Sequence, residues 1–468
     1  MSFKLKLELV IRCFMQSHVK IIVFNIILSL FVCNEAVAFW EKNSSQDEEI
    51  VLPAEGLQRL TTVVTNIKRY YYRKIDVSAL LDSAIKGMLA GLDPHSEYLG
   101  PEDLKELAME TSGKFGGIGV LMIPDQGVIK VITPVDDTPA YRAGIKAGDY
   151  IVQIDNKLVR DMTPSEYVSM MRGPKGSKLS LTILRKNENK PRVITLRREI
   201  IKTKSVKDVL LEPGYGYVRL AVFQESTEKD MVKAIKKLQR LSKGNLKGLI
   251  LDMRSNPGGL LDSAVEVADD FLDATKLKSN KLIVYTKGQD EEGQITAAAT
   301  AGELLPNVSL VILINEGSAS AAEIVAGALQ DHKRAIIVGT RSFGKGSVQT
   351  ILPISRASAI KLTTALYYTP LGRSIQAKGI EPDIDVEDIQ VSHNQGAQSL
   401  PRIDESALID HIQNADGDDD SADGKQRLAA QQKQSKSELE LVYKDYQLYE
   451  ALHTLKTLNV MKSKSSQG

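Results

Sequence analysis

The sequence has few of the residues on which several protein classes depend. Its 468 residues include only two cysteines, Cys13 and Cys33, and both lie near the N-terminus. If that end is removed, no cysteine remains for a disulfide framework, a thiolate nucleophile or a cysteine-based zinc site. Six histidines are present, but no two have the three- or four-residue spacing with which a helix or turn holds a metal ion.

An excess of charge of one sign is also missing, because 60 Lys and Arg residues face 59 Asp and Glu residues. A near-neutral chain lacks the basic face that nucleic-acid binding requires, so we expect no nucleic-acid partner. Hydrophobic residues make up 43% and charged residues 25%, a balance typical of globular proteins. The length exceeds that of one ordinary hydrophobic core and predicts two or more domains.

Long apolar runs are scarce, and the one near the N-terminus is short. Residues 21–32 read IIVFNIILSLFV. They follow a segment, residues 1–20, with more basic than acidic side chains, and they precede the small-x-small pattern Ala-Val-Ala at 36–38. That order is typical of a secretory signal peptide, which we place at residues 1–38. A membrane span needs about 20 apolar residues, so an uncleaved anchor is the weaker alternative. We therefore expect an exported protein.

The rest of the chain divides into stretches of different pattern. Residues 39–100 carry apolar positions at helical spacing and predict an N-terminal helical region. Residues 101–198 are rich in glycine and β-branched residues, whereas residues 199–386 alternate strand-like and helical stretches, which predicts an α/β core. Residues 387–436 are polar and predict a linker, and residues 437–468 return to helical periodicity.

A peptide-binding pattern lies in the glycine-rich stretch. Gly-Gly-Ile-Gly at 116–119 opens a predicted strand, and Ala-Gly-Ile-Lys-Ala-Gly-Asp follows at 143–149. Glycines let backbone N–H groups converge on a C-terminal carboxylate, and the strand after them leaves an edge for a peptide to pair with. Together these motifs resemble a PDZ domain over residues 101–198, with the helix at 164–172 as the other wall of its groove. Its peptide-binding residues are then Gly117, Ile118, Gly119 and Val120.

The stretch with the most chemical information starts with the apolar run Val311–Ile314 and continues through small residues into an alanine-rich helix. A serine at such a junction lies near free N–H groups and positive potential, which suits a nucleophile whose product is an oxyanion. A plain helix-capping serine is the structural alternative. Spacing alone does not decide between Ser318 and Ser320.

A second loop, Gly339–Gln349, supplies a lysine as the candidate base. It is not a phosphate-binding loop, because Gly346 stands where Ser or Thr is required, and Ser342-x-x-Lys345 has no Lys-Thr-Gly partner for a β-lactamase site. A serine hydroxyl needs an adjacent base, and no histidine lies in a recognisable triad motif. Lys345 can serve only if burial lowers its pKa from about 10.4 toward neutrality.

These motifs occur in the order and spacing of a known family. From about residue 50 to residue 385 the sequence resembles the carboxyl-terminal processing proteases, PDZ-containing serine proteases with a Ser–Lys dyad. The resemblance implies a crotonase-like α/β protease core with an inserted β-rich PDZ domain and N-terminal helices. It also implies an endopeptidase that needs no cofactor and no metal. The implied catalytic residues are the nucleophile Ser320, the general base Lys345 and Gln349, which orients it, with the backbone N–H groups of Gly258 and Ala321 as the oxyanion hole.

Two other functions compete with this one. A proteolytically silent PDZ scaffold is disfavoured by the intact Ser320, Lys345 and Gln349, and a non-proteolytic crotonase-like enzyme by the PDZ domain and the lack of a cofactor motif. The expected partners are protein or peptide substrates with accessible C-termini, a lipoprotein adaptor such as some bacterial relatives use, and further copies of the chain through the N- or C-terminal helices. The expected location is the periplasm of a Gram-negative bacterium, with membrane association as a variant. Arg172 is a candidate for linking PDZ occupancy to activity, against the simpler role of a solvated or helix-capping arginine.

Overall fold

The computed structural model describes residues 53–186, 188, 190–278, 280–289, 294–389 and 440–465. The predicted signal peptide and almost all of the predicted linker lie outside the described residues. Within the described part of the chain, no helix is both long and apolar enough to cross a membrane. The chain divides into two compact units, Met1–Ala84 and Ile85–Gly468.

The helices predicted near the N-terminus are present as α2 (Ala54–Tyr70) and α3 (Val77–Ala90). Helix α2 begins after Pro53 and carries Lys68 and Arg69 in its last turn, where positive charge complements the helix dipole. Helix α4 (Pro101–Ser112) follows in the second unit and has proline at its first position, where a missing N–H costs nothing.

The inserted β-rich domain is a twisted antiparallel sheet with two helices. Alternate residues of its strands are buried, such as Leu179, Leu181 and Ile183, as expected of a sheet that buries one face. Helix α6 (Pro164–Met171) begins with a capping box, in which Thr163 and Glu166 bond reciprocally to each other's backbone N–H. The other elements are β3 (Val120–Asp125), β4 (Val128–Pro134), α5 (Pro139–Arg142), β5 (Tyr150–Ile154), β6 (Lys157–Leu158), β7 (Lys178–Leu184) and β8 (Arg192–Arg197).

The chain enters and leaves this domain through a short two-stranded ribbon. Strands β2 (Lys114–Gly117) and β9 (Glu199–Lys202) pair antiparallel, from Lys114 opposite Lys202 to Gly117 opposite Glu199. One residue beyond the paired strands, Thr203 N–H donates a further hydrogen bond to Gly113 O at 2.9 Å. The domain is therefore an insertion between the N-terminal helices and the α/β core.

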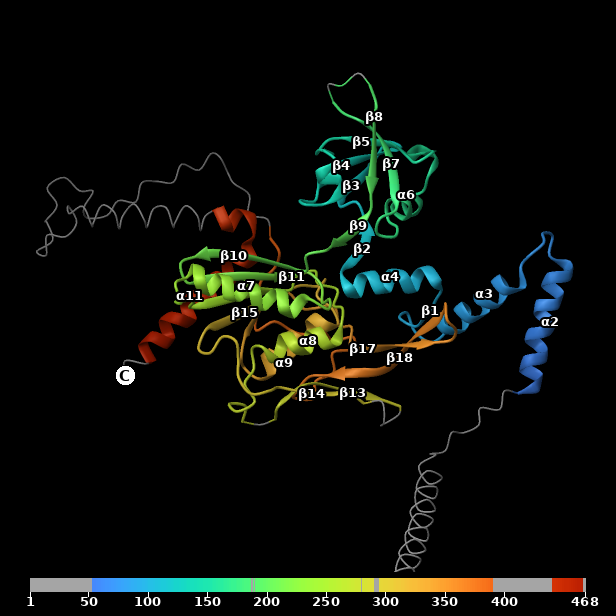
Figure 1. Ribbon diagram of the computed structural model, residues 1–468. Coiled ribbons are helices and arrows are strands. Elements are labelled where there is room, and N and C mark those ends of the chain that lie inside the picture. The colour runs from blue at the N-terminus through green and yellow to red at the C-terminus, as the bar shows by residue number, and fades with distance from the viewer. Residues whose placement is uncertain are drawn as a thin grey trace, which may run out of the picture. The chain divides into compact units, whose positions relative to one another are not determined.

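The α/β core is built on a six-stranded sheet in the order β10-β11-β12-β15-β16-β19 (Figure 1). Strand β10 is antiparallel to β11, and the other neighbours are parallel. Both central strands are buried at every residue, which is typical of a parallel sheet covered on both faces. The strands are β10 (Val206–Glu212), β11 (Tyr215–Leu220), β12 (Gly248–Asp252), β15 (Ser309–Ile314), β16 (Ile336–Gly339) and β19 (Ile384–Asp385).

Different helices cover the two faces of this sheet. Helices α7 (Thr227–Leu241), α8 (Leu261–Asp269) and α9 (Ala321–Asp331) share one hydrophobic cluster with Leu249 and Leu251 of β12. The C-terminal helix α11 (Tyr446–Ser465) packs with Ile250, the residue between them, in a separate cluster. The period-two alternation of a strand thus sends neighbouring residues of β12 to opposite layers.

A second, antiparallel sheet completes the core in the order β1-β18-β13-β14, with β17 also paired to β18. It brings residues near position 97 against residues near position 361. Its strands are β1 (Glu97–Leu99), β13 (Leu282–Gly288), β14 (Thr296–Ala298), β17 (Ser347–Pro353) and β18 (Ala359–Tyr368). The α/β core, the inserted β-rich domain and the N-terminal helices confirm the predicted fold class, and the crotonase-like detail stays a prediction.

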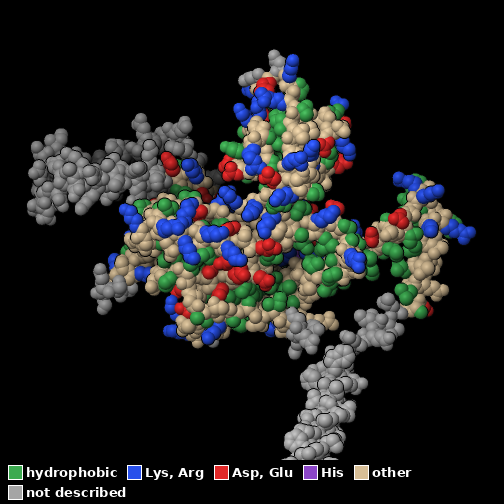
Figure 2. Space-filling view, in the orientation of Figure 1, with side chains coloured by type: hydrophobic (Ala, Val, Ile, Leu, Met, Phe, Trp, Pro, Cys, Tyr) green, Lys and Arg blue, Asp and Glu red, His purple; other side chains and the backbone are tan. Residues whose placement is uncertain are grey.

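The surface matches the balanced composition of the chain. Figure 2 shows Lys and Arg side chains interspersed with Asp and Glu over the face in view.

Candidate active site

The two candidate serines occupy different environments in the turn between β15 and α9. Ser318 is fully buried, donates a hydrogen bond to Met253 O at 2.7 Å and accepts one from Asn315 N–H at 3.0 Å. Ser320 is partly exposed, and its hydroxyl makes no hydrogen bond with any residue that the structure describes. Its φ of 53° lies in the left-handed region, a strained conformation that costs about 1–3 kcal/mol and is typical of functional turns. Ser318 therefore holds the turn, whereas the Ser320 hydroxyl is available.

A buried glutamate joins this turn to the lysine loop. Glu323 has no exposed surface, and its carboxylate accepts four hydrogen bonds. Oε2 accepts from the backbone N–H groups of Ser320 (2.7 Å) and Lys345 (2.9 Å). Oε1 accepts from the Ser342 hydroxyl and the Gly344 N–H, both at 2.6 Å. Sequence reasoning missed Glu323, although a serine followed three residues later by glutamate is the signal of a capping box.

Lys345 is partly buried and lies two residues before the start of β17. Burial lowers the pKa of its ammonium, the like charge of Lys361 lowers it further, and the carboxylate of Glu97 opposes both. Among the described residues, the Lys345 side chain has no hydrogen-bond or ion-pair partner. The structure thus brings the backbones of Ser320 and Lys345 to one carboxylate oxygen without joining their side chains by a hydrogen bond.

Gln349 lies on β17, at a break in the register with β18. Its amide nitrogen donates to the hydroxyls of Ser347 (2.9 Å) and Thr363 (3.3 Å). No hydrogen bond joins Gln349 to Lys345 in the described part of the chain, so the predicted contact between them stays a prediction.

Gly258 lies directly against the turn that carries Ser320. A Cβ atom added to it would be 2.8 Å from Ser320 Cβ and 3.1 Å from Ala321 N, so only glycine fits there. Its N–H donates to the side-chain oxygen of the buried Asn256 at 2.9 Å, and a substrate oxygen would have to compete for it. The N–H of Ala321, at the start of α9, has no acceptor among the described residues. Asn256 is a further residue that sequence reasoning missed.

A charged network anchors this glycine turn to the C-terminal segment. Arg254 donates at 2.7 Å to both Asp252, which is fully buried, and Asp445. Burial alone would lower the pKa of the Arg254 guanidinium, but the two carboxylates raise it overall. Burial would raise the pKa of the Asp445 carboxyl, but Arg254 holds it below its usual value. The segment that leads into α11 is thereby tied to the residue that precedes the glycine turn.

The inserted domain carries a groove between β3 and α6 with a volume of about 160 Å³. Its apolar walls include Met122, Val168 and Met171, and Arg172 lies at its end. The Arg172 guanidinium is 5.5 Å from the centre of the Phe115 ring and 3.4 Å from Glu106. All four predicted peptide-binding residues line this groove, namely Gly117, Ile118, Gly119 and Val120.

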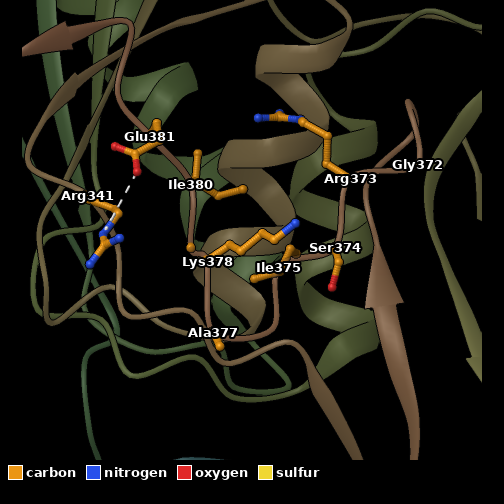
Figure 3. A pocket seen from close by; sticks show the side chains of 10 residues that line it. Arg341, Gly372, Arg373, Ser374, Ile375, Ala377, Lys378, Ile380 and Glu381 are labelled. Atoms are coloured by element: carbon orange, nitrogen blue, oxygen red, sulfur yellow. Dashed lines mark ion pairs between the residues drawn. The ribbon is translucent and has the colours of Figure 1, made fainter.

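A second pocket, of about 560 Å³, is lined by Arg341 of the lysine loop and by residues between Gly372 and Glu381 (Figure 3). Arg341 and Glu381 face each other on one side of it, and the Lys378 side chain extends across it. Neither Ser320 nor Lys345 lines this pocket, although Ala377 in its wall donates to Gly344 O at 2.9 Å. In the described ranges, no cluster of three or more His, Cys, Asp or Glu side chains could hold a metal ion.

Known proteins resemble the chain over these same regions. Residues 214–386 match the model of Peptidase family S41, residues 131–185 a PDZ domain, and residues 30–103 the Activating protease CtpB N-terminal domain. The Carboxy-terminal-processing protease of Bartonella bacilliformis is 47% identical over 332 residues, which cover 71% of this chain and 75% of the relative. Carboxy-terminal processing protease CtpA of Bacillus subtilis is 33% identical over 361 residues, which cover 77% and 74%.

A solved structure, the photosystem II D1 C-terminal processing protease, is 30% identical and aligns over 72% of this chain and 94% of its own, with a TM-score of 0.41. The family resemblance seen in the sequence is confirmed by the identity to the two bacterial relatives. The chain therefore belongs to the carboxy-terminal-processing proteases, serine-type peptidases of family S41 that carry a PDZ domain.

Proposed function

We propose that the protein is an endopeptidase that cleaves near protein C-termini with Ser320 as nucleophile, Lys345 as general base and Gln349 as the residue that orients Lys345. The observation that carries this proposal is the single oxygen of Glu323 that accepts from the backbone N–H of both Ser320 and Lys345. The Ser320 hydroxyl, which is available, and the Lys345 side chain, which has no partner among the described residues, thus belong to residues whose backbones are held close together by Glu323. A base must lie within reach of the hydroxyl it activates, and this arrangement favours that contact.

In the proposed reaction, the neutral Lys345 amine accepts the proton of the Ser320 hydroxyl as Oγ attacks the peptide carbonyl. The ammonium then gives this proton to the departing amine, which leaves an acyl-enzyme ester. Lys345 next removes a proton from the water that attacks the ester, and its ammonium returns a proton to Ser320 Oγ as the new C-terminus is released. Burial of Lys345 lowers its pKa and so increases the neutral fraction that can act as base near neutral pH.

The negative oxygen formed in each attack is assigned to the N–H groups of Ala321 and Gly258. Ala321 N–H is at the N-terminus of α9, where the helix dipole also favours negative charge. Gly258 N–H would exchange its bond with Asn256 for one to the oxyanion, which would make this donor available mainly when charge develops.

Recognition is assigned to the groove of the PDZ domain. A C-terminal carboxylate would meet the N–H groups of residues 117–119, and an apolar last side chain would fill the space near Val168 and Met171. Arg172, which contacts Phe115, stays the candidate for linking peptide binding in the groove to protease activity. Export to the periplasm, a lipoprotein adaptor and self-association through terminal helices stay expectations from the sequence.

The test is digestion of an unfolded model protein with an apolar C-terminus, followed by mass spectrometry of the products. Wild type should cleave the substrate. In Ser320→Ala and Lys345→Ala the rate of cleavage should fall by about 10³-fold or more, as expected when a nucleophile or its base is removed. The control is Lys378→Ala, because this exposed lysine lies in a neighbouring loop and should be dispensable. Full activity in Lys345→Ala would overturn the dyad, and peptide binding without any cleavage would favour the scaffold.

A further inference from the structure

Asp93 lies far from the protease motifs in the sequence, but its contacts lead to them. It follows α3, and its carboxylate accepts hydrogen bonds from the backbone N–H groups of His95 (2.8 Å) and Ser96 (3.0 Å) and from the Ser96 hydroxyl (2.6 Å). A fourth hydrogen bond comes from the hydroxyl of Thr363 on β18, at 3.1 Å. Thr363 N–H in turn donates to the Ser96 hydroxyl at 3.1 Å, so the turn and the strand hold each other.

These contacts fix the direction of each hydrogen bond. An ionised carboxylate only accepts, so the Thr363 hydroxyl must donate its single proton to Asp93. The Thr363 oxygen is then an acceptor, and the atom of the Gln349 amide that lies 3.3 Å from it must be the nitrogen. The hydrogen bond from the Ser96 hydroxyl, with those from His95 and Ser96 N–H and from Thr363, lowers the pKa of Asp93 and keeps it ionised.

The orientation of the Gln349 amide has a consequence for its oxygen. Its nitrogen is engaged by both Thr363 and Ser347, so the oxygen is the one amide atom left to accept a further bond. Among the described residues this oxygen has no donor, and the Lys345 side chain has no acceptor. Lys345 comes two residues before β17, the strand that carries Gln349 opposite Thr363 of β18. The charges of Glu97 and Lys361, on the neighbouring strands β1 and β18, act on the pKa of Lys345.

We infer that Asp93 is a positioning residue for the protease reaction, which acts through the Thr363 hydroxyl to present the Gln349 amide oxygen, rather than the nitrogen, to Lys345. The inference rests on the proposed roles of Lys345 and Gln349. Without the carboxylate, the Thr363 hydroxyl can donate to the Gln349 oxygen, and the amide can turn its nitrogen toward the lysine. Asp93 lies in residues 30–103, outside the S41 match, so the N-terminal region supplies a part of the site.

The experiment is a double-mutant cycle on the full-length chain, with the unfolded model protein as substrate and kcat and KM measured separately. Asp93→Asn keeps the shape and one oxygen but removes the obligate acceptor, and Thr363→Val removes the hydroxyl without a change of charge. Each should lower kcat by about 10-fold with KM nearly unchanged, because each disturbs the same orientation. In a Gln349→Ala background, neither substitution should lower kcat further, because residues that act through one another are not additive.

The matched control is Thr364→Val. Thr364 is the next residue on β18, and its hydroxyl pairs with that of Thr350 on β17 at 2.7 Å, outside the Asp93 contacts. It should retain wild-type kcat, and thermal unfolding should show that all variants are folded. Equal loss of kcat from Asp93→Asn in the wild-type and Gln349→Ala backgrounds overturns the inference and leaves the proposed function intact. Full activity of Ser320→Ala or Lys345→Ala in the same assay would instead overturn the proposed function.

Discussion

The two halves of the candidate active site are held in different ways. In the half around Ser320, the proposed nucleophile, buried groups fix the backbone of this nucleophile half. Ser318 donates to Met253 O, and Asn256 accepts from both Gly258 N–H and Ala319 N–H. In the lysine half, Glu323 fixes only the backbone of Lys345, and the lysine side chain has no partner among the described residues. The fold thus sets the position of both loops, while the Lys345 side chain, the proposed base, is surrounded by side chains of β1, β17 and β18.

The largest effect should come from the residue that the two halves share. Glu323→Gln replaces one carboxylate oxygen, which accepts hydrogen bonds, with an amide N–H₂ group, which can only donate. In this fully buried position the new group would face N–H or O–H donors and would lack a partner. Each unsatisfied buried group costs about 1–3 kcal/mol, so the free energy of unfolding should fall by about 2–4 kcal/mol. Displacement of both loops should lower kcat/KM by about 10²-fold or more. Denaturant unfolding and digestion assays measure the two effects.

The control for this variant is Glu316→Gln in the same turn. Glu316 is exposed, and it accepts one hydrogen bond, from Thr340 at 3.3 Å, so its amide should behave as wild type. If Glu323→Gln were as active and as stable as Glu316→Gln, the shared carboxylate would not couple the two halves.

A smaller effect is expected where the C-terminal segment supports the nucleophile half. Asp445→Asn weakens the contact with Arg254, whose side chain is 12% exposed, against 28% for Asp445. A hydrogen bond between charged groups contributes about 1.5–3 kcal/mol, and activity should fall by about 10-fold as the glycine turn after Arg254 loosens. Glu440→Gln is the control, because Glu440 is exposed in the same segment.

The pH dependence of this contact has a definite sign. Arg254 holds the pKa of the Asp445 carboxyl below its unfolded value of about 3.9, despite the opposing effect of burial. The contribution to stability is therefore fully present above pH ~4 and is lost as pH falls through the lower, folded pKa. The difference in unfolding free energy between wild type and Asp445→Asn should be constant near neutral pH and shrink in acid. A constant difference throughout would show that the charge of Asp445 is not what matters.

The sequence predicted the parts of the site that depend on local backbone. Gly119 and the strand-to-helix turn at Ser320 are readable because both have a positive φ, 75° and 53°, which favours glycine or a residue in a tight turn. Glu323 was readable in principle, since it lies three residues after Ser320 and caps the same helix. Local spacing therefore predicts the turn that carries Ser320, although it does not distinguish Ser320 from Ser318.

The contacts that a single sequence could not predict join residues far apart in the chain. Thr363 and Asp93 are 270 positions apart, and Arg254 and Asp445 are 191 apart. Each of these residues is a common polar type in an ordinary local context, and only the pairing of β1 with β18 and the packing of α11 bring them together. A different reason applies to the bond between Gly258 N–H and Asn256, which are only two positions apart, since it depends on the precise path of a turn.

The smallest expected effect tests whether the lysine half responds to the charges beside it. Lys361 and Glu97 pair with each other at 2.8 Å, and after burial their charges shift the pKa of Lys345 in opposite directions. Lys361→Gln removes a like charge, so the pKa of Lys345 should rise and the acid limb of the kcat profile should move to higher pH. Glu97→Gln removes an opposite charge, so the limb should move to lower pH.

The two variants are controls for each other, because they break the same ion pair and differ only in which charge remains. Both displacements should shrink when salt is added, since Glu97 is 55% exposed and surface charges are screened. Burial, the larger cause of the lowered pKa, is the same in both variants, so the changes in rate should be smaller than that of Asp445→Asn. Displacement of both limbs in the same direction would mean that a change of structure, rather than charge, governs Lys345. Opposite displacements would show that the lysine half responds to the charges beside it, whereas the turn that carries Ser320 is held by hydrogen bonds to its backbone.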